Sequence, residues 1–513
     1  MYVEQVSISM LRSFRQAEIQ FCHPDAPEPP PIPNVTLLLG DNGAGKTSVL
    51  RAIALAALAP VLASSSGFRP YRLVRRTRTE VPRQALVRGM FLLHGQDIGE
   101  KKARGPAELA STETRIVVRG DLEEVKAKEN MPPVWNTIFQ ETSPGFLVVG
   151  YGASRRVESS ASFDSSVRSK SRFVRYQRVS GLFEEAVTLT PLGSWLPEFR
   201  RVNKGRHNQV ISLINRLLPP GTQILDQTVN GEYVFEHNGA LVPFAALSDG
   251  YRAYIGWIAD LLYHVCMGAP GGHRLDENRG IVLVDEIDLH LHPEWQRTVV
   301  PQLAKALPRL QFVLTSHSPL VVGTLHSANL RLIEADETGA SRVKQLQEHV
   351  HGMTADQILV SSYFGLSTPR APDAVGGLLA LSQRARRGDH QAARDFLLQL
   401  SRATFTAEEQ KAMAATDEAT AEVPGSAERQ ETMKATARKA AGAGPAATKA
   451  IGKKSVRTKS GATKSTAKGS GGTKSGTTKS TAKKSAGAET TREANGMSAD
   501  GSRARTGRER PRS

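Results

Sequence analysis

Short, uninterrupted runs of apolar residues recur along the first two thirds of the chain. Residues 35–39 (VTLLL) and 280–284 (GIVLV) are the clearest, and residues 146–149 and 312–314 look similar. Such runs are typical of parallel strands that are covered on both faces. Helical periodicity separates them, so the alternation from residue 2 to about residue 345 predicts an α/β fold with a mostly parallel sheet.

The interruptions of this pattern predict the domain organisation. We predict one α/β domain over residues 1–345, with insertions, expected to be helical, at about 69–127 and 157–205, where the sequence is charged and weakly periodic. Residues 346–401 have a helical pattern and predict a small C-terminal extension. Residues 402–513 contain no aromatic residue after Phe405. Because such a segment buries too little apolar surface to offset the entropy of ordering, we predict a disordered tail.

Charge is concentrated in this tail. The whole chain has a formal net charge of +17, and residues 434–513 hold 20 basic and 4 acidic residues, a net of +16. Two similar 15-residue segments rich in Lys, Ser and Thr, 458–472 and 473–487, lie within it. A flexible polycation binds nucleic acid phosphates without sequence preference. The tail therefore predicts non-specific nucleic acid binding, with a solvated linker as the alternative.

Several classes of protein are excluded by what the sequence lacks. No apolar run approaches the roughly 18–20 residues of a membrane-spanning helix, and the first residues lack the pattern of a signal peptide. Cys22 and Cys266 are the only cysteines, so neither a disulfide framework nor a four-cysteine zinc site is available. We expect a reduced, cytoplasmic setting and no membrane partner.

A phosphate-binding loop is the strongest motif. Residues 40–47 (GDNGAGKT) follow an apolar strand and precede a helical stretch, which is the context that the pattern GxxxxGK[ST] requires. Glycines let backbone N–H groups approach phosphates, while Lys46 reaches the outer phosphates and Thr47 offers a hydroxyl to Mg²⁺. The predicted ATP-binding residues here are Gly40, Asp41, Asn42, Gly43, Ala44, Gly45, Lys46, Thr47 and Ser48.

An acidic pair follows the second apolar run. Asp285 and Glu286 directly follow the strand predicted at 280–284. A P-loop needs such a partner, because Asp285 would hold Mg²⁺ together with Thr47, and Glu286 would orient and deprotonate the attacking water. The predicted metal ligands are therefore Thr47 and Asp285.

Two further motifs narrow the class. In LSDGYR, Ser248 lies 37 residues before Asp285, and His317 lies 32 residues after it, directly behind an apolar run. The order P-loop, LSxG, acidic pair and histidine resembles that of ATP-binding-cassette (ABC) ATPases. Four segments, VVGYGASR (148–155), LSDGYRA (247–253), VDEIDLHLHPEWQ (284–296) and TSHSPLVV (315–322), resemble the SMC/RecF-like and OLD-like ATPases. The same segments look like those of the bacterial AAA family ATPases, a group that includes the ATPase component of Septu-type anti-phage systems.

This resemblance implies roles for the motifs. It implies an ABC-type head, with Glu286 as catalytic base, His317 as sensor of the γ-phosphate and Lys46 at the transferred phosphate. A head-to-tail homodimer would sandwich two ATP molecules, with Ser248 and Gly250 acting in trans. His290 and His292 would lie in the dimer-interface loop. The implied function is an ATP-hydrolysing switch in defence or DNA processing, with a nuclease or effector subunit as partner.

Some features depart from the family pattern. No clear Gln-loop is present, and either Gln96 or residues 151–155 would take its place. No long coiled coil is predicted, and residues 346–401 leave no space for a Toprim nuclease. An ABC transporter subunit is one alternative, but the 202 residues between Lys46 and Ser248 exceed the compact spacing of transporter motifs. A nucleoid-type nucleic-acid-binding protein with a vestigial ATPase is another, against which the intact motif set argues.

Overall fold

The computed structural model describes residues 1–64, 72–78, 81–95, 97, 107–128, 131–139, 147–157, 174–184, 187–229, 231–268 and 273–402. All described residues lie within residues 1–404, which form one compact unit. The prediction of a disordered basic tail therefore lies outside the described residues, as do Gln96 and parts of both predicted insertions.

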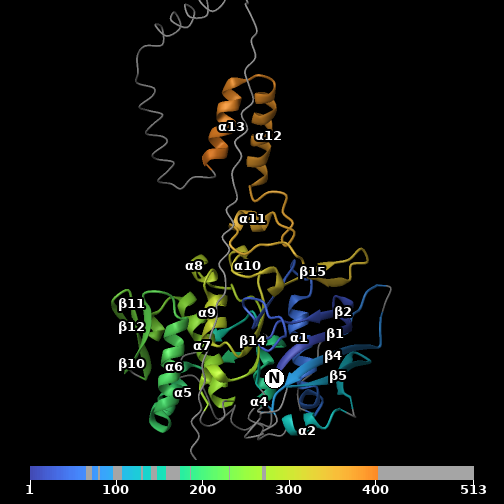
Figure 1. Ribbon diagram of the computed structural model, residues 1–513, viewed down its shortest axis with the longest axis vertical. Helices are drawn as coiled ribbons and strands as arrows, with labels where there is room; N and C mark the ends of the chain where they lie inside the picture. The colour runs from blue at the N-terminus through green and yellow to red at the C-terminus, as the bar shows by residue number, and fades with distance from the viewer. Residues whose placement is uncertain are drawn as a thin grey trace, which may run out of the picture. The chain divides into compact units, whose positions relative to one another are not determined.

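A six-stranded sheet forms the centre of the described unit (Figure 1). Its five neighbouring strands β15, β3, β14, β13 and β7 are parallel, and β16 pairs antiparallel with β15 at one edge. Every residue of β3, β13 and β14 is buried, which confirms the prediction of parallel strands covered on both faces. The strands, in sheet order, are β16 (Ser341–Lys344), β15 (Leu330–Ala335), β3 (Val35–Leu39), β14 (Leu310–Thr315), β13 (Gly280–Val284) and β7 (Val148–Tyr151).

Alternate residues of each central strand enter two different hydrophobic cores, because successive side chains of a strand point to opposite faces. In β13, Val282 and Val284 join one core, and Ile281 and Leu283 join the other. The first core is built with α5 (Leu192–Val202), α6 (Lys204–Leu217), α7 (Asp249–Gly268) and α9 (Val299–Ala306). The second is built around α1 (Lys46–Ser64), the helix that follows the P-loop.

A second, antiparallel sheet also packs on α1. Its strand order is β2-β1-β4-β5-β6, with β1 (Tyr2–Leu11), β2 (Phe14–Gln20), β4 (Gln84–Leu93), β5 (Glu108–Arg119) and β6 (Leu122–Ala127). The described residues of the first predicted insertion thus form strands, and the expectation of helices there was wrong. Buried and more exposed positions alternate along β4, but Arg88 and Gly89 interrupt the apolar pattern in the sequence.

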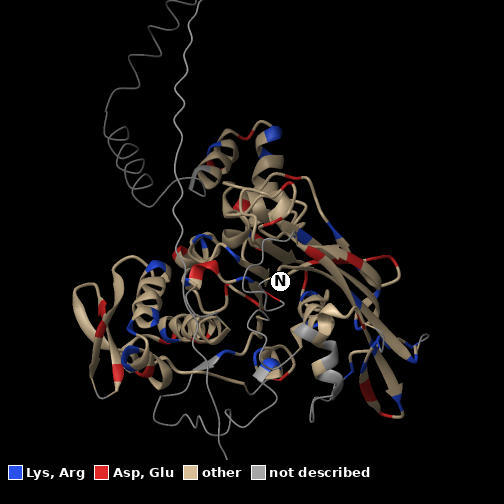
Figure 2. Cartoon of the chain, turned by 60° about the horizontal axis from the view of Figure 1, so that its bottom comes forward, with Lys and Arg blue, Asp and Glu red and all other residues tan. Residues whose placement is uncertain are grey.

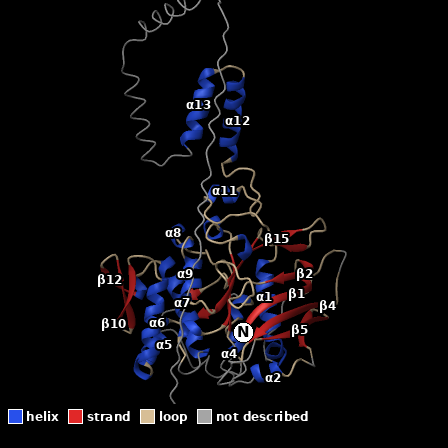
Figure 3. Cartoon of the chain, viewed as in Figure 1, coloured by secondary structure: helices blue, strands red, loops and turns tan. Residues whose placement is uncertain are grey.

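The remaining described elements surround these two sheets (Figure 3). They include a small sheet of β10 (Thr222–Val229), β11 (Glu232–His237) and β12 (Ala240–Pro243), and a short parallel pair, β8 (Arg156–Val157) and β9 (Thr188–Leu189). The short helices beside these sheets include α2 (Val134–Ile138), α4 (Val174–Gln177), α8 (Pro293–Gln296) and α10 (Pro319–Val322).

Residues 346–401, predicted as a helical extension, contain α11 (Ala355–Leu359), α12 (Pro372–Arg386) and α13 (His390–Arg402). Thr354 and Gln357 cap α11 reciprocally, and α12 and α13 pack against each other. Figure 2 shows basic and acidic residues interspersed along the described elements. None of the helices in the described part of the chain is both long and apolar enough to cross a membrane.

Candidate active site

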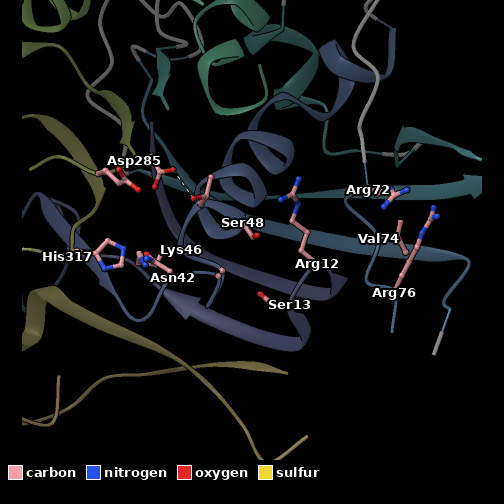
Figure 4. A pocket seen from close by; sticks show the side chains of 14 residues that line it. Arg12, Ser13, Asn42, Lys46, Ser48, Arg72, Val74, Arg76, Asp285 and His317 are labelled. Carbon is pink, nitrogen blue, oxygen red and sulfur yellow. Dashed lines mark hydrogen bonds between the residues drawn. The ribbon is translucent and has the colours of Figure 1, made fainter. Parts of the chain in front are cut away.

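The predicted motifs meet at one edge of the central sheet. Strands β3, β14 and β13 are parallel neighbours, so the segments that follow their carboxyl ends lie together. They enclose a cavity of about 660 Å³ (Figure 4). Nine predicted site residues line it: Asn42, Gly43, Gly45, Lys46, Thr47, Ser48, Asp285, Glu286 and His317.

The P-loop backbone depends on glycine at its last turn. Gly45 has a φ of +111°, and a Cβ there would lie 2.4 Å from Ser13 Oγ and 2.7 Å from the Phe14 ring. Ala44, next to it, accepts a hydrogen bond at its carbonyl from the Ser341 hydroxyl at 2.6 Å. The loop is therefore held between the β1–β2 turn and strand β16, at the start of α1, where backbone N–H groups can face an anion.

Lys46 crosses the loop that precedes it. Its Nζ donates to the carbonyl oxygens of Gly40 at 2.8 Å and Asp41 at 3.0 Å. Burial lowers the pKa of Lys46, and the carboxylates of Asp285 and Glu286 oppose this shift. The ammonium group thus sits beside two acidic groups at the position where a P-loop lysine meets phosphate. Gly40 and Asp41 contribute through these carbonyls and do not line the cavity.

Asp285 is held on both sides by hydroxyl groups. The Thr47 hydroxyl donates to Asp285 Oδ2 at 2.7 Å, and the Thr315 hydroxyl donates to Asp285 Oδ1 at 2.7 Å. Asp285 is almost fully buried, yet it lines the cavity beside Thr47. Hydroxyl and carboxylate oxygens are the hard ligands that Mg²⁺ prefers, so this pair fits the metal that accompanies ATP in P-loop proteins.

Glu286 has a strained backbone. Its φ is +50°, a conformation that costs energy in residues other than glycine and that clusters at active sites. Its N–H donates to Thr315 Oγ1 at 2.7 Å, so Thr315 contacts both members of the acidic pair. Glu286 lines the cavity together with Asp285.

His317 lies two residues beyond strand β14, on the segment that leads into α10. Ser318 caps that helix by accepting from the N–H groups of Leu320 and Val321, and its hydroxyl donates to Gln296 Oε1 at 2.7 Å. Figure 4 shows His317, Asn42 and Lys46 toward one end of the cavity.

Ser248 and Gly250 are not among the described residues that line the cavity. They lie at the start of α7, where a Cβ on Gly250 would come 3.0 Å from the carbonyl oxygen of His290. The signature motif therefore packs against the loop that carries His290 and His292. His292 Nδ1 accepts from the Glu294 N–H and caps α8.

Sequence reasoning missed one wall of the cavity. Arg12, Ser13, Arg72, Val74 and Arg76 line it in addition to the motif residues, and Figure 4 shows Arg72, Val74 and Arg76 toward the end away from His317. Arg12 occupies the turn between β1 and β2 with a φ of +48°. No motif marks these positions, although basic residues that meet near a P-loop suit a polyphosphate ligand.

The fold and the cavity together define a P-loop nucleotide-binding protein with its motifs in ABC order. Two protein-family profiles agree with this class. Residues 153–323 match the family described as "AAA domain, putative AbiEii toxin, Type IV TA system", and residues 5–80 match the family described as "AAA domain".

Sequence similarity to individual proteins points to the same class of protein. The chain is 25% identical over 365 residues to the Septu protein PtuA of Bacillus mycoides (strain KBAB4), covering 71% of this chain and 45% of PtuA. It is 31% identical over 147 residues to the retron Ec83 probable ATPase of Escherichia coli, covering 29% of this chain and 27% of that ATPase. The chain therefore spans less than half the length of these relatives. These matches confirm the resemblance to AAA-domain ATPases of the Septu type.

A solved structure described as "Crystal structure of the SmcHead bound to the C-winged helix domain of ScpA" is also similar. Its TM-score is 0.42 at 16% identity, and the match covers 67% of this chain and 98% of that chain.

Proposed function

We propose that this protein is an ATPase that dimerises on ATP and uses hydrolysis to switch its action on a partner. The carrying observation is the hydrogen-bonded group of Thr47, Asp285 and Thr315, which holds the acidic pair against the P-loop. Lys46, Glu286 and His317 line the same cavity. This arrangement supports an intact catalytic centre rather than a vestigial one.

The P-loop would bind the phosphates of ATP. Its backbone N–H groups and the start of α1 face the anion, and Lys46 Nζ would exchange the Gly40 and Asp41 carbonyls for phosphate oxygens. Mg²⁺ bound with the nucleotide would be held by Thr47 and Asp285 and would neutralise charge on the phosphates.

Hydrolysis requires a base and a group that stabilises the developing charge. Glu286 would accept the proton of a water whose oxygen attacks the γ-phosphorus, and the bond to the β–γ bridging oxygen would break, so that ADP leaves with the electron pair. His317 and Lys46 would donate hydrogen bonds to the γ-phosphate oxygens. Lys46, Glu286 and His317 lie in segments that follow the neighbouring strands β3, β13 and β14 of the central sheet.

The signature motif supports a composite site. Because Ser248 and Gly250 do not line the cavity of their own subunit, we infer that a second copy supplies them to the bound ATP. Similarity to the Septu protein and to a retron probable ATPase supports a role in defence, with a nuclease or nucleic acid as the controlled partner.

The test is a comparison of ATP binding, turnover and oligomeric state. Glu286→Gln should bind ATP, lose turnover and accumulate as an ATP-bound dimer, because the base is lost and the phosphate cradle is intact. Lys46→Ala should lose binding and dimerisation. Glu294→Gln, the same change at an exposed position on α8, is the matched control. Turnover by Glu286→Gln at the rate of this control would contradict the assignment.

A further inference from the structure

Arg155, just beyond strand β7, contacts the main chain of the acidic pair. Its Nη2 donates to the carbonyl oxygen of Asp285 at 2.8 Å and also to the carbonyl oxygen of Glu286. Its Nε donates to the Gly152 carbonyl at 3.2 Å. One guanidinium group therefore spans the two peptide units that carry the Mg²⁺ ligand and the base, at the point where Glu286 has a positive φ.

The same arginine also reaches the signature helix. Its guanidinium carbon lies 5.9 Å from the centre of the Trp257 ring on α7, within the range of a cation–π contact. Burial lowers the pKa of Arg155 to about 10, while the carboxylates of Asp285, Asp288 and Glu286 oppose the shift. The group therefore keeps its charge at neutral pH.

Tyr151 makes a second, parallel connection. Its carbonyl oxygen accepts from the Asp285 N–H at 2.9 Å, and its hydroxyl donates to Oδ2 of the buried Asp260 at 2.8 Å. Asp260 lies on α7 one turn after Trp257 and also accepts from the Thr190 N–H at 2.7 Å. The Tyr151 ring packs edge-on against Trp257, with the ring centres 5.9 Å apart.

These contacts leave β7 between two functional elements. It pairs with β13, which is followed directly by Asp285. Tyr151 at its end and Arg155 just beyond it contact α7, which begins at the signature motif. We propose that Arg155 is a positioning residue that fixes the backbone of Asp285 and Glu286 and, with Tyr151, couples it to the signature helix α7 of the same subunit. The inference rests on the proposed ATPase function.

A planar guanidinium makes this connection from two nitrogens of one rigid plane, because Nε donates to Gly152 while Nη2 donates to Asp285 and Glu286. The ammonium group of lysine has a single nitrogen on a flexible stem and cannot hold all three carbonyl groups in this geometry. Arg155→Lys keeps the charge and removes the fork. Because Arg155 does not line the cavity, ATP affinity should stay within roughly 3-fold of wild type. Because Arg155→Lys weakens hydrogen bonds from a charged group that position Asp285 and Glu286, kcat should fall roughly 10- to 100-fold.

Arg331 provides a matched control. It is a buried arginine on β15 whose guanidinium donates to the carbonyl oxygens of Gln20, Ala328 and Leu330 at 3.0, 2.9 and 2.9 Å, and it does not line the cavity. Arg331→Lys removes a comparable fork from a comparable environment. It should lower the thermal midpoint and leave kcat unchanged.

The coupling to α7 is tested by a double-mutant cycle. Tyr151→Phe keeps the ring and removes the hydrogen bond to Asp260, so it should lower kcat with little effect on ATP affinity. Combined with Arg155→Lys, its effect should be less than multiplicative, because both changes release the same backbone. Fully multiplicative effects would reject the shared role of Tyr151.

Hydrogen exchange separates this inference from the proposed function. The full-length protein is compared as wild type, Arg155→Lys and Arg331→Lys, with protection followed in a peptide covering residues 284–291. Faster exchange in that peptide in Arg155→Lys alone would support the inference. Equal protection in the two variants would overturn it, whether or not ATP is hydrolysed. Absence of turnover in wild type would instead contradict the proposed ATPase function.

Discussion

The Thr315 hydroxyl donates to Asp285 Oδ1 at 2.7 Å and, at the same distance, accepts from the N–H of Glu286. Thr315 itself is completely buried at the end of β14. One hydroxyl group therefore satisfies the carboxylate of Asp285 and the N–H of Glu286, the two residues that directly follow β13. Two motifs that are separate in the sequence meet through this single oxygen atom.

Thr315→Val should remove both interactions with little change in shape. The variant leaves a buried carboxylate oxygen and a partly buried N–H without this partner, so the free energy of unfolding should fall by about 1–3 kcal/mol. ATP turnover should fall about 10-fold or more, because the orientation of Asp285 and Glu286 is lost. Chemical denaturation and steady-state ATPase assays measure the two effects.

The control for this change is Thr324→Val. The Thr324 hydroxyl donates to the Val321 carbonyl at 2.7 Å at the end of α10, and Thr324 does not line the cavity. It should leave turnover unchanged. If Thr315→Val hydrolysed ATP as fast as Thr324→Val, the hydroxyl bridge would have no part in catalysis.

A second prediction concerns the basic wall that the motifs did not reveal. Arg12→Ala should raise the KM for ATP roughly 3- to 10-fold, because an exposed charge at the cavity contributes about 1 kcal/mol to phosphate binding. The effect should shrink as salt rises. Arg15→Ala changes an exposed arginine of neighbouring β2 that does not line the cavity, and it should leave KM unchanged. An equal KM for ATP in the Arg12→Ala and Arg15→Ala variants would exclude Arg12 from nucleotide binding.

The sequence was sufficient for the centre of the fold and for the motif residues. Strands β3, β13 and β14 are apolar throughout, and the P-loop and acidic pair are contiguous in the sequence, so both could be recognised locally. Strand β4 was missed because Arg88 and Gly89 obscure its alternation. The pattern becomes clear only when α1 is seen to cover one of its faces.

Residues that act through tertiary contacts could not be predicted. Arg155 lies 130 residues before Asp285, and its role depends on main-chain carbonyl groups, which leave no trace in the sequence. Arg12 and Arg76 lie 64 residues apart and meet only at the cavity. For the Gln-loop, residues 151–155 are described beside the acidic pair, whereas Gln96 lies outside the described residues.

A third prediction concerns the basic tail. Deleting residues 434–513 removes a net charge of +16 and none of the residues that line the cavity, so basal ATPase activity should be unchanged. Non-specific nucleic acid affinity should largely disappear at low salt. In the full chain, log affinity for duplex DNA should fall with log salt with a slope of about −0.9 for each neutralised phosphate.

Mobility-shift assays at two salt concentrations measure this effect. The matched control keeps the tail length and replaces its Lys and Arg residues with Gln, which separates charge from the presence of a long segment. Equal nucleic acid affinity in the full chain and both variants would place the binding surface on the ATPase domain, and the tail would then act as a solvated linker.

The last prediction tests whether the active site is shared between subunits. Lys46→Ala should inactivate the P-loop, and Ser248→Arg should inactivate the signature motif, because a long charged side chain blocks the approach of a second nucleotide-binding face. Neither variant should hydrolyse ATP alone. In a mixed dimer, the Lys46→Ala subunit still offers an intact signature motif to the intact P-loop of the Ser248→Arg subunit, so one active site forms. ATPase activity should therefore rise on mixing and peak near equal amounts of the two proteins. A mixture of Lys46→Ala with Glu286→Gln provides the control. It should stay inactive, because one subunit cannot bind ATP and the other lacks the catalytic base. No recovery at any ratio, with both variants folded, would rule out the head-to-tail arrangement and would require Ser248 and Gly250 to act within their own subunit.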